Sequence, residues 1–155
     1  MAKYSIERSV GPLIRRNHQI GLAIFAERFN GYDITPMQYS VLWTLLKADA
    51  LDQATLAQAV ALDRNTCSNI LARLEKSGRI SRRVDPNNRR TKLVSISDDG
   101  RKLMAELKKP MESVQSKILQ PLSPAERRVF LELLSKLADS NNDLSRAPFK
   151  YLPLK

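Results

Sequence analysis

Residues 82–92, RRVDPNNRRTK, place five cations in eleven positions around a DPNN turn. Arginine and lysine donate strong hydrogen bonds to phosphate and carboxylate oxygens, and like charges this dense repel one another unless an anionic partner neutralises them. A charged strand edge that only prevents aggregation needs about one or two cations. The stretch therefore indicates a surface that binds a polyanion.

The basic charge is concentrated in one part of the chain. The 155 residues carry 26 Lys and Arg against 16 Asp and Glu, a net charge of +10. Residues 64–92 alone contain nine cations and two anions, a net charge of +7. With 43% hydrophobic residues the chain can also build a core, so the basic segment belongs to a folded domain and not to a disordered tail.

The segment 63–77, just before the basic stretch, predicts a helix with one apolar and one polar face. Asp63 is a suitable N-cap, and the apolar face consists of Cys67, Ile70, Leu71 and Leu74. The opposite face carries groups that hydrogen-bond to base edges in the major groove of DNA, with arginine suited to guanine and asparagine to adenine. These candidate DNA-contacting residues are Arg64, Asn65, Thr66, Ser68, Asn69 and Arg73. In an isolated helix they would be a solvated face, and the basic stretch that follows favours DNA recognition.

Residues 53–62 predict a shorter helix that completes a helix-turn-helix. This motif needs a small residue where the helices cross and a tight turn between them, and Ala57 and Ala61 occupy these positions. Apolar residues at fixed offsets lock the two helices together: Val60, Leu62, Cys67 and Ile70. Glycine is commoner at the turn, so we expect Ala61 to adopt a backbone conformation that glycine reaches more easily.

Residues 80–84 and 92–96 predict two strands around the DPNN turn, which makes 80–96 a basic hairpin, or wing. Cations at the tip of such a hairpin can contact the sugar-phosphate backbone or enter the minor groove while the preceding helix occupies the major groove. The candidate wing contacts are Arg82, Arg83, Asn87, Asn88, Arg89, Arg90 and Lys92.

The flanking segments predict long amphipathic helices. Thr35 and Ser123 each begin a capping box with proline at the first helical position, and Ser97 is suited to cap a further helix. Pro110 lies within the apolar periodicity of that helix and predicts a kink. The tail after Ser140 lacks helical periodicity but contains apolar side chains that we expect to dock on the body or on a partner subunit: Phe149, Tyr151, Leu152 and Leu154.

The sequence offers little for catalysis or for a metal. One cysteine, Cys67, and one histidine, His18, provide no zinc cluster, and we find no phosphate loop and no nucleophile with a suitably spaced base. We therefore predict no catalytic residue, no metal site and no cofactor. The chain lacks a signal-like start and a membrane-spanning apolar run, so we expect a cytoplasmic protein that does not bind membranes.

Residues 51–100 resemble the MarR family of winged helix-turn-helix bacterial transcription regulators. The resemblance rests on LDR-x-T at 62–66, RLEKSGRI at 73–80, the wing DPNNRR and the closing SDDG. It implies a mainly α fold with a small β-wing, a homodimer with a helical dimerisation region, and binding to double-stranded palindromic operator DNA. The implied organisation is one domain, 1–155, with an N-terminal dimerisation helix (8–34), the winged helix-turn-helix (35–100), C-terminal dimerisation helices (98–140) and a tail (141–155).

Two further expectations follow from the resemblance. The family wing often reads D-x-x-D-R-R, with the second Asp paired to the arginine that enters the minor groove, but here Asn88 takes its place, so Arg90 is the minor-groove candidate with a neutral neighbour. Members also bind small molecules, often phenolic or aromatic acids, between the dimer helices and the winged domain. Cationic donors beside aromatic walls would suit an aromatic carboxylate, and the candidate residues are Arg15, His18, Leu22, Phe25, Tyr39 and Trp43.

We expect a dimeric repressor released by a small aromatic acid, and other functions remain open. One alternative is a constitutive nucleic-acid-binding protein without a ligand. Another is a redox-responsive regulator acting through Cys67, although an apolar locking position favours a structural thiol. A basic RNA-binding protein is a third alternative. An enzyme that binds its substrate through Arg15 and His18 is a fourth, and no residues supply its chemistry.

Overall fold

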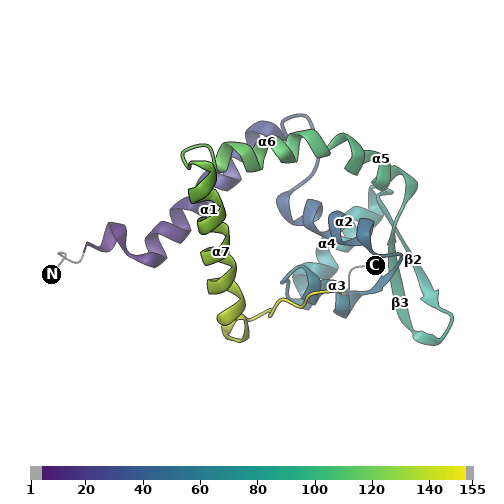
Figure 1. Cartoon of the computed structure of the whole chain (residues 1–155). Helices are drawn as coiled ribbons and strands as arrows, with labels where there is room; N and C mark the ends of the chain where they lie inside the picture. The colour runs from purple at the N-terminus through teal and green to yellow at the C-terminus, as the bar shows by residue number, and fades with distance from the viewer. Residues whose placement is uncertain (1–4, 153–155) are drawn as a thin grey trace.

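A computed structural model describes residues 5–152 of the chain. Within this range the chain forms mainly helices and one small sheet (Figure 1). The elements are η1 (Ile6–Arg8), α1 (Val10–Arg28), α2 (Pro36–Lys47), β1 (Leu51–Asp52), α3 (Gln53–Ala59), α4 (Arg64–Lys76), β2 (Ile80–Asp85), β3 (Asn88–Ile96), α5 (Asp98–Glu106), α6 (Lys108–Ile118), α7 (Pro124–Ser140) and η2 (Asn142–Leu144). This is the mainly α fold with a β-wing that the sequence predicts.

The core lies where α2, α3, α4 and the sheet meet. Leucine side chains at helical spacing supply most of its fully buried volume, because each of these helices turns one apolar stripe inward: Leu42, Leu45, Leu56, Leu71 and Leu74. Phe25 and Phe29 of the first helix stack on each other at a centroid distance of 3.9 Å and extend the core toward α1. The compact unit that carries α4 and the hairpin is therefore held by ordinary apolar packing.

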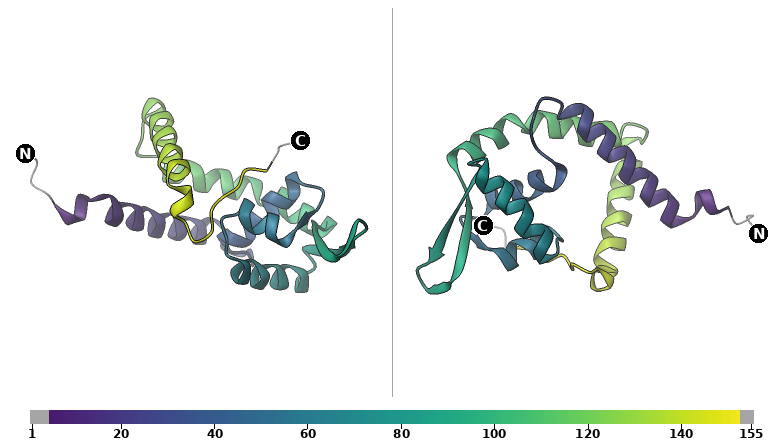
Figure 2. Two further views of the ribbon diagram at one scale, coloured as in Figure 1. Left: turned by 90° about the horizontal axis from the view of Figure 1, so that it is seen from below. Right: turned by 180° about the vertical axis from the view of Figure 1, so that it is seen from behind.

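The sheet is antiparallel, with the strand order β1-β3-β2. Ile80 pairs with Ile96 at the base of the hairpin, and the register shifts between Val84 and Asp85 near its tip. The Asp85 carboxylate accepts the backbone N–H of Asn87 at 2.9 Å, which closes the turn. The hairpin projects from one end of the molecule, and the first turns of α1 project from the other (Figure 2).

The predicted helix caps are confirmed. Thr35 and Ser123 each form a complete capping box, with Gln38 and Glu126 respectively. Ser97 accepts the backbone N–H of Gly100 at 3.0 Å and begins α5. These side-chain acceptors satisfy N–H groups that have no partner inside their helix, which is why the helices begin at these residues.

The long helix after Ser97 is broken, as the sequence predicts, but the break lies before Pro110. α5 ends at Glu106 and α6 begins at Lys108, with Leu107 fully buried between them. A proline ring clashes with the carbonyl of the residue four positions earlier, which here is Glu106. The proline therefore breaks the helix in the turn that precedes it.

Apolar side chains of α1 and α7 lie on the surface. α1 packs along α6, whereas α7 runs away from the end of α6 as a separate arm (Figure 1). The exposed apolar residues of these two helices are Val10, Leu13, Ile14, Ile20, Leu22, Val129, Phe130, Leu131, Leu133, Leu134 and Leu137. Within residues 5–152, we find no helix with the length and apolar character needed to span a membrane.

The C-terminal segment, residues 145–152, returns from α7 to the body of the chain, as predicted. The Lys150 N–H donates to the carbonyl of Gln58 on α3 at 3.0 Å. Asn142 accepts the N–H of Phe149 at 2.7 Å and donates to its carbonyl at 3.0 Å. The segment is thus tied both to α3 and to the end of α7, while the expected docking of Leu154 lies outside the described residues.

Candidate DNA interface and effector cavity

Helix α4 presents the polar face that the sequence predicts. The carboxylate of Asp63 accepts the Thr66 N–H at 2.9 Å and its hydroxyl at 2.6 Å, which fixes the start of the helix. These hydrogen bonds lower the pKa of Asp63. The predicted contact residues Arg64, Asn65, Thr66, Asn69 and Arg73 are exposed, and Ser68 is half-buried. The helix therefore presents exposed hydrogen-bond donors and acceptors on the side away from the core.

The turn between α3 and α4 has the geometry of a helix-turn-helix. Ala61 has φ of +51°, the left-handed conformation expected from its position. The Leu62 N–H donates to the carbonyl of Ala57 at 2.9 Å across the turn. Cys67 is fully buried, and Val60, Leu62 and Ile70 pack against the core. These contacts fix the angle at which α4 leaves α3.

The hairpin carries four exposed cations and one that pairs with a carboxylate of the same chain. Arg83, Arg89, Arg90 and Lys92 are exposed, as are Asn87 and Asn88. The Arg82 side chain, by contrast, is only 20% exposed. Its Nε lies 3.1 Å from a carboxylate oxygen of Glu75 on α4. It shares a strand face with buried Ile80, because residues two apart point to the same side of a sheet. We therefore remove Arg82 from the candidate DNA contacts and assign it to the attachment of the hairpin to α4.

Asn88, which replaces the usual family Asp, orients the backbone of the hairpin. Its Oδ1 accepts the N–H of Arg90 at 3.1 Å. This hydrogen bond holds the main chain of Arg90 without binding its guanidinium group. The backbone of Arg90 is thus held in place, while its side chain remains exposed.

Arg79 is a residue that the motif analysis did not single out. Its guanidinium group donates to the carbonyl of Asp33, and Ser97 Oγ donates to the carbonyl of Gly78 at 2.6 Å. The first hydrogen bond ties the base of the hairpin to the loop before α2, and the second ties it to the N-cap of α5. The residues around Arg79 do not indicate this role, because its partner is a backbone carbonyl 46 positions away in the sequence.

Cys67 lies inside the helix-turn-helix and not at its surface. Burial raises the pKa of its thiol, and this effect outweighs the opposing charge of Arg82. A protonated, buried thiol is a poor nucleophile and reacts slowly with oxidants. The geometry favours the structural role for Cys67.

A cavity of about 800 Å³, here called the interhelical cavity, lies between α1, α2 and α6. Five of the six predicted ligand-binding residues line it: His18, Leu22, Phe25, Tyr39 and Trp43. Arg15 is not among the lining residues, and its guanidinium group donates instead to Gln19 at 3.3 Å. Polar side chains that the sequence analysis missed come from α6, which no local pattern links to α1 and α2: Lys108, Glu112 and Gln115.

Tyr39 and Trp43 form an aromatic wall of the interhelical cavity. Their rings stack at 6.3 Å with an interplanar angle of 11°, and Trp43 is 44% exposed. Burial, with a further contribution from the negative charge of Glu112, raises the pKa of Tyr39. Its phenol therefore remains protonated at neutral pH and can donate a hydrogen bond to a ligand. Among the described residues there is no cluster of three or more His, Cys, Asp and Glu side chains that could hold a metal ion.

An exposed polar helix locked in a helix-turn-helix, with a basic hairpin beside it, defines a winged-helix DNA-binding protein. Residues 34–92 match the model of the MarR family. The fold superposes with a TM-score of 0.85 on BpsR of Bordetella bronchiseptica, whose DNA binding is regulated by 6-hydroxynicotinic acid, at 31% identity over 89% of this chain and 99% of that one. The chain belongs to the MarR family of transcription regulators, and the predicted resemblance is confirmed.

Two other relatives are also regulators of transcription. The transcriptional repressor NicR of Pseudomonas putida is 28% identical over 140 residues, which is 90% of this chain and 89% of that protein. PcaV of Streptomyces coelicolor, solved in complex with its natural ligand, superposes with a TM-score of 0.80 at 29% identity, over 90% of this chain and 99% of that one. The chain is thus similar over nearly its whole length to repressors and ligand-binding regulators.

Proposed function

We propose that the protein is a homodimeric repressor that binds a palindromic DNA duplex and is released by a small aromatic acid. The observation that carries the proposal is the placement of the exposed polar face of α4 beside the free cations of the β2–β3 hairpin. Side chains that hydrogen-bond to bases and side chains that neutralise phosphates then face the same duplex. The proposal assigns no catalytic step to the chain.

The two surfaces have different roles in this proposal. The outward side chains of α4 contact base edges in the major groove, with Arg64 and Asn69 suited to guanine and adenine. Arg83, Arg89, Arg90 and Lys92 contact the backbone or, in the case of Arg90, the minor groove. Asn87 and Asn88 lie at the tip of the same hairpin and contribute neutral hydrogen bonds.

The dimer is supported by the apolar surfaces of α1 and α7. Phe130, Leu133 and Leu137 lie on one side of α7 and are 41%, 57% and 55% exposed. An apolar arm of this length is unfavourable in water, and a second copy that packs against it would bury it. A two-fold dimer that sets two α4 helices about 34 Å apart would contact successive major grooves of one duplex.

The effector proposal rests on the interhelical cavity and on the relatives. Tyr39 and Trp43 offer aromatic faces, while His18 and Lys108 offer donors to a carboxylate. BpsR responds to 6-hydroxynicotinic acid, an aromatic carboxylate of the proposed kind. The cavity lies between the helices proposed to form the dimer and the winged helix. A ligand that fits only one relative arrangement of these two parts would shift the protein toward that arrangement.

The test selects bound sequences from a random pool of DNA duplexes. We expect a palindrome whose half-sites lie about 10 base pairs apart, and we expect Arg64→Ala or Asn69→Ala to change the preferred bases. Adding 6-hydroxynicotinate or benzoate should then release the duplex, with saturable heat in calorimetry. Binding without sequence preference, or preference for A-form RNA in competition, would contradict the proposal. Sequence-specific binding with neither heat nor release would identify a constitutive DNA-binding protein.

A further inference from the structure

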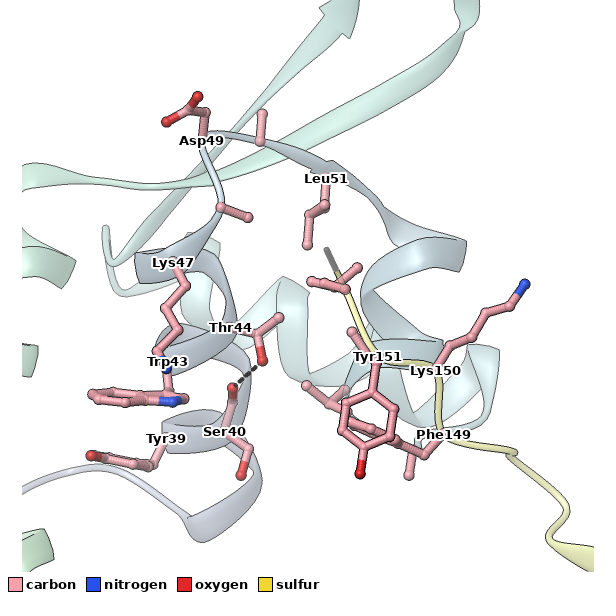
Figure 3. A pocket seen from close by; sticks show the side chains of 16 residues that line it. Tyr39, Ser40, Trp43, Thr44, Lys47, Asp49, Leu51, Phe149, Lys150 and Tyr151 are labelled. Carbon is pink, nitrogen blue, oxygen red and sulfur yellow. Dashed lines mark hydrogen bonds between the residues drawn. The ribbon is translucent and has the colours of Figure 1, made fainter. Parts of the chain in front are cut away.

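A second cavity of about 710 Å³, here called the C-terminal cavity, lies between α2, the α3–α4 turn and the C-terminal segment (Figure 3). Its walls come from residues 39–47 of α2, residues 48–51, residues 59–61 and residues 149–152. It shares only Tyr39, Ser40 and Trp43 with the interhelical cavity. The stacked aromatic pair on α2 is therefore the border between two separate spaces.

The wall made by the C-terminal segment is held in place by specific contacts. The Lys150 N–H binds the Gln58 carbonyl on α3, and the Phe149 backbone is held on both sides by Asn142. The rings of Phe149 and Tyr151 pack edge to face at 4.8 Å, and the Tyr151 hydroxyl donates to Asp139 of α7 at 3.1 Å. The segment therefore joins the arm α7 to the helix-turn-helix and closes one side of the cavity.

The lining has the composition of a small-molecule site. Most of it is apolar, from alanines of residues 48–61 together with Leu51, Val60, Phe149 and Leu152. Lys47 is the lining cation from α2, and its Nζ lies over the Trp43 ring, 4.7 Å from the ring centre (Figure 3). Asp49 is the lining carboxylate, and its side chain points away from the C-terminal segment in the same view. Lys150 points away from the cavity in the same view. A volume of this size with mostly apolar walls and few polar groups is typical of ligand pockets.

We propose that the C-terminal cavity is a second ligand site, which takes an aromatic monoanion larger than a single ring. The apolar rings would lie between α2 and residues 149–152, and the anionic group would pair with Lys47. A ligand placed there contacts the α3–α4 turn and the C-terminal segment at once. It therefore stabilises the docked position of the segment, which goes beyond the function proposed for the interhelical cavity.

The test uses the full chain and 1-naphthoate as the probe. Trp43 is the only tryptophan of the sequence and borders both cavities, so its fluorescence reports binding to either. Val60→Phe fills the C-terminal cavity and Gln115→Phe fills the interhelical one. We expect Val60→Phe to weaken naphthoate binding by about tenfold or more and Gln115→Phe to leave it unchanged. The opposite pattern, or no saturable binding to the wild type, would overturn the proposal.

A second pair of variants tests the role of the C-terminal segment without filling a cavity. Phe149→Ala removes a lining ring, whereas Leu144→Ala removes an 84% exposed side chain of the preceding turn that does not line the cavity. We expect only Phe149→Ala to weaken naphthoate binding, and we expect naphthoate to slow amide exchange of residues 149–152 in the wild type. Equal affinity in both variants with no change in exchange would overturn the proposal. DNA binding is measured separately, so a failure of the regulator assignment would leave this result interpretable.

Discussion

The Nε atom of Arg82 on β2 lies 3.1 Å from a carboxylate oxygen of Glu75 on α4, and this ion pair joins the hairpin to the helix that precedes it. The two side chains are 20% and 46% exposed, so solvent weakens the pair without abolishing it. The pair is one of the contacts that hold the hairpin beside the polar face of α4. It acts together with the hydrogen bonds of Arg79 and Ser97 at the base of the hairpin.

We predict a measurable coupling between these two residues. In a double-mutant cycle of Arg82→Met and Glu75→Gln, urea unfolding should give a coupling free energy of about 0.5–1 kcal/mol, as for partly exposed ion pairs. Strictly additive effects would show that the two side chains do not stabilise the fold by interacting with each other.

The joint between the hairpin and α5 should not tolerate a side chain at Gly100. A Cβ atom there would lie 2.2 Å from the carbonyl oxygen of Arg79 and 2.7 Å from the side chain of Ile96. We expect Gly100→Ala to lower the free energy of unfolding by more than about 2 kcal/mol, because a backbone group must move.

Gly21→Ala is the matched control for this substitution. Gly21 lies within α1, and its Cβ would meet Ile118 at 3.8 Å, an ordinary contact. Alanine is the better helix former, so this variant should be more stable by about 0.5–1 kcal/mol. Equal effects of the two substitutions in chemical denaturation would contradict the close packing at Gly100.

The N-cap of α4 should contribute stability that depends on pH. The hydroxyl and backbone N–H of Thr66 bind the Asp63 carboxylate and hold its pKa below the usual 3.8. A carboxyl group with a lowered pKa stabilises the fold above its unfolded pKa, and this contribution disappears as the pH falls through the folded pKa. Asp63→Asn retains an acceptor that does not titrate, so its melting temperature should fall less steeply below pH 3.8 than that of the wild type. Parallel melting curves over that range would refute this role for Asp63.

Cys67 should be unreactive in the folded protein. Because burial raises the pKa of its thiol, we expect native Cys67 to react with a disulfide reagent at least about a hundredfold more slowly than in urea. The unfolded chain, which contains one cysteine, supplies the reference rate. Fast reaction of the native thiol together with release of DNA by peroxide would support a redox-sensing regulator instead.

Local patterns predict most of this fold. The caps at Thr35, Asp63, Ser97 and Ser123 are visible in the sequence because a cap depends on residues three positions apart. The strained turn at Ala61 also follows from its place between two amphipathic helices. These features require no knowledge of distant contacts.

The parts that sequence reasoning missed depend on distant contacts. The inward position of Arg82 follows from the alternation that begins at Ile80, but its partner on α4 emerges only when the hairpin is placed. Arg15 shares helix α1 with His18, yet only His18 lines the interhelical cavity, whose third wall is α6. The C-terminal cavity depends on a hydrogen bond between Lys150 and Gln58, which no periodicity indicates.

The most direct measurement of the central proposal, that α4 and the hairpin contact DNA, is the salt dependence of duplex binding by Arg90→Ala. Arg16→Ala, which removes an exposed cation of α1, is the control. We predict that Arg90→Ala weakens binding and makes the slope of log affinity against log salt shallower by about 0.9 for each phosphate that the arginine neutralises, whereas Arg16→Ala leaves the slope unchanged. If Arg90→Ala changed neither the affinity nor the slope, the hairpin would not contact DNA and the proposal would be wrong.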